Sequence, residues 1–86
     1  MNKERHAKIE KILVDYFQPE HIELIDESHK HIGHEGAKTG LSHYKLILQS
    51  KKLNDLNSIA QHRIIYQALG DLMQTDIHAL SIVVIT

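Results

Sequence analysis

The stretch Ser42-His43-Tyr44-Lys45-Leu46-Ile47-Leu48-Gln49-Ser50 alternates in polarity, and this alternation predicts a β-strand. Because successive side chains of a strand point to opposite faces, Tyr44, Leu46 and Leu48 share one face. The other face receives His43, Lys45, Ile47 and Gln49. A strand with one strongly apolar face needs a cover, so this stretch predicts a sheet packed against helices on one side.

Upstream of this strand, the sequence predicts a helix and then another strand. From Lys3 to Phe17, apolar residues recur at helical spacing before Pro19, namely Ile9, Ile12, Leu13, Tyr16 and Phe17. From His21 to Glu27 the sequence alternates again, with Ile22 and Leu24 on one side, and we expect this strand to be antiparallel to Ser42–Ser50. The stretch from Ser28 to Leu41 has Gly33, Gly36 and Gly40 and no periodicity, which predicts a long loop.

Downstream, the sequence predicts a short turn or helical piece over Lys51–Leu56, a helix and a last strand. Asn57 is a suitable N-cap for a helix that runs to about Gln74, with an apolar stripe of Ile65, Leu69, Leu72 and Met73. His78 to Thr86 is rich in β-branched residues, and we expect this strand at the centre of the sheet because both of its faces are apolar. The prediction is therefore an α+β fold, αββαβ, whose three-stranded sheet is covered on one face by two main helices.

Length and composition exclude several classes of protein. Eighty-six residues suffice for one domain, which we place over residues 1–86. The net charge of −1 gives no overall attraction to nucleic acid or anionic lipid, and the absence of cysteine excludes thiolate sites made by this chain alone. We find neither a nucleophile motif nor a pair of carboxylates in an identifiable cleft, so we expect a protein that is not an enzyme. Without a signal peptide or an apolar run long enough to span a membrane, we expect the cytoplasm or an equivalent matrix compartment.

Histidine is the unusual component of this sequence. Of eight histidines, four lie close together, at His29, His31, His34 and His43. Neutral imidazoles on a glycine-rich loop are good ligands for transition metals. The alternative is that these side chains are simply solvated, since the spacing is not that of a zinc finger. For His43, packing or hydrogen bonding between the two strands is the simpler interpretation, and support of a metal-binding histidine is the alternative.

Four short stretches, in order, resemble the signatures of BolA-like proteins. They are Asp26-Glu27-Ser28 followed by His31, then Ser42-His43-Tyr44-Lys45, His62-Arg63-Ile64-Ile65-Tyr66 and Ile77-His78-Ala79-Leu80. The resemblance covers roughly residues 5–85. It implies the αββαβ arrangement related to the type II KH fold, which agrees with the order of elements inferred above.

The resemblance also implies a site. In BolA-like proteins a loop residue between the first two strands and a histidine that opens the last strand ligate one side of a [2Fe–2S] cluster. The corresponding residues are His31 and His78, and His34 is the alternative to His31 because Gly33-His34-Glu35-Gly36 is flexible. A core histidine beside Ile77 and Leu80 is the competing interpretation of His78.

A cluster held in this way needs ligands from another molecule. Two histidines cannot complete a [2Fe–2S] site, so we expect no cluster to be bound stably by this chain alone. The missing cysteine points to a thiol-bearing partner, which the resemblance implies is a monothiol glutaredoxin with bound glutathione.

Nucleic-acid binding is the alternative from a different class. The helix after Asn57 follows a short turn, as in a helix-turn-helix element, and it carries Gln61, Arg63 and Gln67, with Lys51 and Lys52 nearby. One arginine on this helix makes at most a local basic patch, so we expect DNA binding to be weak and non-specific.

Overall fold

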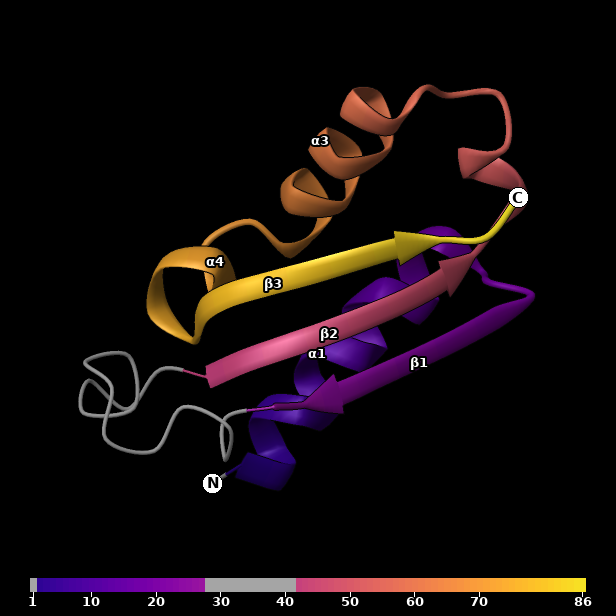
Figure 1. The fold of residues 1–86 in the computed structure, drawn as a ribbon. Helices are drawn as coiled ribbons and strands as arrows, with labels where there is room; N and C mark the ends of the chain where they lie inside the picture. Colours follow the sequence, from indigo (N-terminus) through magenta and orange to yellow (C-terminus); the bar gives the residue numbers. More distant parts are fainter. Residues whose placement is uncertain (1, 28–41) are drawn as a thin grey trace.

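The computed structural model describes residues 2–27 and 42–86. Their elements are α1 (Asn2–Phe17), β1 (His21–Asp26), β2 (Ser42–Gln49), the 3₁₀ turn η2 (Lys51–Leu53), α3 (Ser58–Leu69), α4 (Leu72–Thr75) and β3 (Ile77–Val84). The α+β fold with two main helices, α1 and α3, and a three-stranded sheet is confirmed (Figure 1). The loop predicted over Ser28–Leu41 lies outside the described residues.

The strand order in the sheet is β1-β2-β3, so the prediction that the last strand lies at the centre is wrong. β1 pairs with β2 antiparallel, with Leu24 opposite Leu46, and β3 pairs with β2 in parallel. A parallel neighbour needs a crossover, which α3 and α4 supply between β2 and β3. The apolar residues of β3 misled the prediction because they do not lie on two buried faces: Val83 faces solvent.

Among the described residues, the buried core lies on one face of the sheet. The central strand β2 contributes Tyr44, Leu46 and Leu48, as its alternation predicts. Helix α1 contributes Ile9, Leu13 and Phe17, and α3 contributes Ile65 and Leu69. Tyr16 was predicted to share the apolar stripe of α1, but its side chain is 43% exposed. Its ring instead contacts Phe17 edge-on and lies 5.4 Å from the Lys52 ammonium.

The helix ends follow local backbone chemistry. The Asn57 side chain accepts a hydrogen bond of 2.9 Å from the Ala60 N–H, which confirms the predicted N-cap. Gly70 has φ +54° and ends α3, so the single helix predicted to run to Gln74 is wrong. A short helix, α4, follows instead and leads into β3.

Among the described residues, no helix combines the length and the apolar character that crossing a membrane requires.

Candidate functional site

The rings of His43 and His78 lie side by side where β2 and β3 begin. Their centroids are 4.8 Å apart and their planes are tilted by 45°. His43 is half-buried and His78 is exposed, so the interpretation of His78 as a core histidine is wrong. The structure thus joins one predicted ligand, His78, to a residue that the sequence favoured for packing or hydrogen bonding.

A shift in strand register brings these two rings together. Ser42 is opposite Ile77, but His43 is opposite Ala79, so His78 is an extra residue on β3. Extra residues of this kind bend a strand and redirect a side chain, often beside functional sites. With strict alternation, His78 would share the face of Leu80, which packs against the core. The shift instead leaves His78 exposed beside His43.

Polar contacts fasten the two strand starts to α1. The Arg5 guanidinium donates a hydrogen bond to the Ser42 hydroxyl, and its Nε lies 3.5 Å from the Asp76 carboxylate. The Lys8 ammonium also lies 3.5 Å from the Asp76 carboxylate. The Ser42 N–H donates to the Asp76 carbonyl oxygen over 3.2 Å. Since Ser42 precedes His43 and Asp76 lies two residues before His78, these contacts fix the backbone that presents both imidazoles.

The charges around the starts of β2 and β3 stabilise the ionised form of the Asp76 carboxylate. A hydrogen bond of 2.6 Å from the Thr75 hydroxyl lowers the pKa of Asp76, and the charges of Lys8 and Arg5 lower it further. Nearby, burial raises the pKa of the Tyr44 hydroxyl. The Asp76 carboxylate is therefore held in its charged form beside two cations of α1, Arg5 and Lys8.

The exposed imidazole of His78 fits one position of a metal or cluster site. Neutral imidazole nitrogens ligate iron, and histidine replaces cysteine on one iron of some [2Fe–2S] centres. Across residues 2–27 and 42–86, no three His, Cys, Asp or Glu side chains are grouped to hold a metal ion. The predicted ligands His31 and His34 lie outside the described residues. Further ligands must therefore come from that segment or from another molecule.

Some of the residues predicted to contact nucleic acid are exposed, whereas others already form hydrogen bonds within the protein. Arg63 and Gln67 are exposed on α3 and line a shallow pocket with Ile59, His62 and Tyr66. The prediction for Gln61 is wrong, because this side chain is buried and its amide donates 2.9 Å to the Leu53 carbonyl oxygen. Lys51 is exposed. The Lys52 ammonium, though exposed, donates to the Tyr16 carbonyl oxygen over 2.7 Å.

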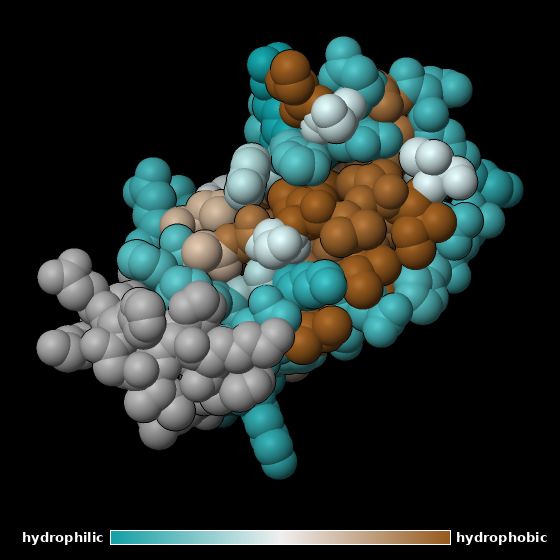
Figure 2. Space-filling view, in the orientation of Figure 1, coloured by the Kyte–Doolittle hydropathy of each residue, from teal (hydrophilic) through white to brown (hydrophobic). Residues whose placement is uncertain are grey.

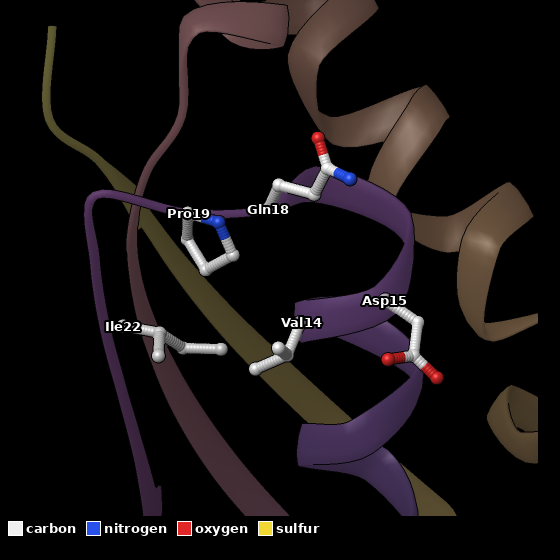
Figure 3. Close-up of a pocket in the computed structure, with 5 residues that line it drawn as sticks. All are labelled: Val14, Asp15, Gln18, Pro19 and Ile22. Carbon is white, nitrogen blue, oxygen red and sulfur yellow. The ribbon is translucent and has the colours of Figure 1, made fainter.

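A second depression, of about 740 Å³, lies between the end of α1 and β1. Figure 3 shows Val14 and Ile22 pointing toward each other across it, while Asp15 and Gln18 point away. Pro19 completes the wall. These residues bring no cluster of titratable side chains together, so the histidine pair remains the better candidate for chemistry.

Sequence reasoning missed the residues that support this pair. Arg5, Lys8 and Asp76 have no local motif that marks them, because their contacts depend on how α1 packs against the corner between α4 and β3. The spacing of Arg5 and Lys8 places both on one side of a helix, which is the only sequence signal for a shared partner.

Comparisons with known proteins match this chain along most of its length. Residues 13–86 match the sequence model of the family described as BolA-like protein. The "DNA-binding transcriptional regulator BolA" of Vibrio cholerae is 40% identical over 74 residues, which cover 86% of this chain and 67% of that protein. The protein of the same name from Escherichia coli is 35% identical over 75 residues, covering 87% of this chain and 69% of the relative.

A solved structure shares the fold closely. The BolA domain of SufE1 from Arabidopsis thaliana superposes with a TM-score of 0.82 at 32% sequence identity. The superposition covers 93% of this chain and 88% of that domain. The arrangement of helices around the three-stranded sheet is therefore shared with a known domain.

Proposed function

This chain belongs to the BolA-like protein family, and on that premise we propose that it is a non-enzymatic interaction protein that binds a monothiol glutaredoxin with its glutathione. The two proteins share a [2Fe–2S] cluster as cargo in iron–sulfur cluster assembly, trafficking or sensing. The observation that carries the proposal is the pair of neighbouring imidazoles, His43 and the exposed His78, in a chain without cysteine. We place this exchange in the cytoplasm or an equivalent matrix compartment, because thiols stay reduced there.

The ligand count explains why a partner is needed. Each iron of a [2Fe–2S] cluster binds two sulfides and needs two more ligands. We assign one position to His78 and a second to His31, with His34 as the alternative. Thiolates of the glutaredoxin and glutathione occupy the others. The ring of His43 limits the rotation of His78 and so orients it before the cluster arrives.

Substitution of His78 tests the assignment. When His78→Ala is mixed with a cluster-loaded monothiol glutaredoxin, we expect the visible circular dichroism of the mixed complex to disappear and affinity to fall at least about tenfold. His21→Ala is the matched control, because His21 is an exposed histidine at the other end of the sheet. Both variants should unfold at the wild-type temperature, since neither ring lies in the core. An unchanged spectrum and affinity for His78→Ala would refute the assignment.

Two further measurements complete this test. His31→Ala should weaken or alter the spectrum, and His34→Ala should retain more of the signal. The isolated wild-type protein should stay colourless after attempted cluster reconstitution, because it lacks the remaining ligands. A stoichiometric cluster retained by the protein alone would contradict the need for a partner.

Weak DNA binding is the second candidate function. It is supported by the names of the relatives and by the exposed Arg63 and Gln67 on α3. In an anisotropy titration, affinity should fall steeply with salt, and Arg63→Ala should reduce the salt slope by about one. Lys11→Ala, which removes an exposed cation from α1, is the control. Sequence-selective, sub-micromolar binding at physiological salt would rank DNA binding above cluster sharing.

A further inference from the structure

The two edges of the sheet differ in a way that predicts contact with another strand. The β1 edge spans six residues and carries Glu23 and Asp26, which are charges of the kind that discourage strand addition. The β3 edge spans eight residues, Ile77–Val84, without a charged residue, proline or glycine. Long, uncharged, apolar edges of this kind pair readily with a further strand.

The backbone groups on the outer side of β3 are regularly spaced. The Ile85 N–H donates to the Leu48 carbonyl oxygen over 2.9 Å, so Ile85 points its backbone toward β2. Because backbone direction alternates along a strand, the N–H and C=O groups of Leu80, Ile82 and Val84 point away from β2. Within the described part of the chain, no strand pairs with this side of β3. These groups are set symmetrically about Ile82.

The side chains beside this edge are apolar and accessible. Val83 is 44% exposed and Ile85 37% exposed on the open face of the sheet. Figure 2 shows hydrophobic side chains gathered on this face, over the C-terminal half of β3. A strand added beside β3 would cover the sides of these residues and so remove part of this surface from water.

We propose that β3 pairs antiparallel with β3 of a second copy of this chain, about a two-fold axis near Ile82. This arrangement joins two three-stranded sheets into one of six strands. It sets Leu80 opposite Val84 of the second copy, and Ser81 opposite Val83 of the second copy. No charge opposes a like charge, and every outward backbone group of Leu80, Ile82 and Val84 gains a partner. Pairing with β1 of a second copy is disfavoured, because it would bring Glu23 and Asp26 against an apolar edge.

A charge exchange at the exposed positions 81 and 83 tests the pairing. Ser81→Glu/Val83→Glu places like charges opposite each other across the two-fold axis, whereas Ser81→Glu/Val83→Lys places opposite charges there. Lys45 is the neighbour of Ser81 on β2, so the new carboxylate at position 81 is compatible with the fold in both variants. Ile25→Glu alters an exposed residue of the other edge and serves as the control.

Sedimentation velocity from about 10 µM to 1 mM measures the association. The wild type and Ile25→Glu should dimerise with rising concentration, and the like-charge variant should associate at least about tenfold more weakly. The opposite-charge variant should recover wild-type association or exceed it, and high salt should narrow the difference. A wild type that stays monomeric, equal association of the two double variants, or loss of association in Ile25→Glu would overturn the proposal.

Discussion

Asp76 shows how one residue supports a site that it does not touch. Its carboxylate accepts a hydrogen bond from Thr75 and lies near both Arg5 and Lys8, just before the strand that carries His78. We predict that Asp76→Asn lowers the free energy of unfolding by about 1 kcal/mol at neutral pH, because it takes the charge out of the hydrogen bond from Thr75 and removes two ion pairs. Chemical denaturation measures this loss. Asp15→Asn breaks only the exposed pair with Lys11 and should change stability by less than about 0.5 kcal/mol.

The difference in stability between the wild type and Asp76→Asn should depend on pH. The pKa of Asp76 is lowered from 3.8 in the folded protein, so its contribution is complete above that value. It is lost as the pH falls below 3.8 and through the lower pKa of the folded state. The stabilities of wild type and Asp76→Asn should therefore converge in strong acid. A difference that stayed constant there would mean that shape rather than charge makes this residue important.

The histidines mark how far the sequence predicts the site. The resemblance identified His78 as a ligand candidate, but the position of its ring depends on the shift that pairs His43 with Ala79. No local pattern encodes that shift, because it requires two strands distant in sequence to meet in parallel. The contact of His78 with His43, and the support from Arg5, could therefore be found only in the structure.

At the scale of elements, Gly70 decides where α3 ends. Its backbone has a φ of +54° and a ψ of −127°, a conformation that residues other than glycine rarely adopt. A Cβ atom there would meet nothing closer than 3.8 Å, so space is available and the backbone itself sets the cost. We predict that Gly70→Ala destabilises the protein by about 1–3 kcal/mol in chemical denaturation.

Gln67→Ala is the matched comparison for this substitution. Gln67 is exposed on α3, where alanine is a good helix former, so stability should stay within about 0.5 kcal/mol of the wild type. An equally stable Gly70→Ala variant would show that the turn can adopt another conformation without cost.

The periodicity of the sequence predicted which helices and strands form better than it predicted their order in the sheet and where they end. Strict alternation identified β1 and β2, and helical spacing identified α1 and most of α3. It could not place β3, because an apolar strand at an edge and one at a centre have the same composition. Helical spacing also continued past Gly70 into Leu72 and Met73, so the break became visible only through the backbone of that glycine.

Across the whole molecule, the two faces of the sheet differ: one is buried and the other is accessible. The face toward α1 and α3 contains the buried cluster that holds the fold together. The open face carries accessible residues such as Ile25 and Val83. The histidine pair lies where β2 and β3 begin, away from the centre of that cluster. The fold can therefore present a binding site without exposing its core.

Leu46 and Ile47, adjacent on the central strand, test this division directly. Leu46 is completely buried between the sheet and the helices, whereas Ile47 is half-buried on the open face. Leu46→Ala should cost about 2–5 kcal/mol, because it leaves a cavity in a packed interior, and Ile47→Ala should cost about 1 kcal/mol. Chemical denaturation at low protein concentration, where the monomer prevails, compares the two.

Equal losses would mean that the open face is as important to stability as the core, and the division between the faces would be wrong. A loss several times larger for Leu46→Ala would place most of the stability on the helix-covered face, leaving the other face free to bind partners.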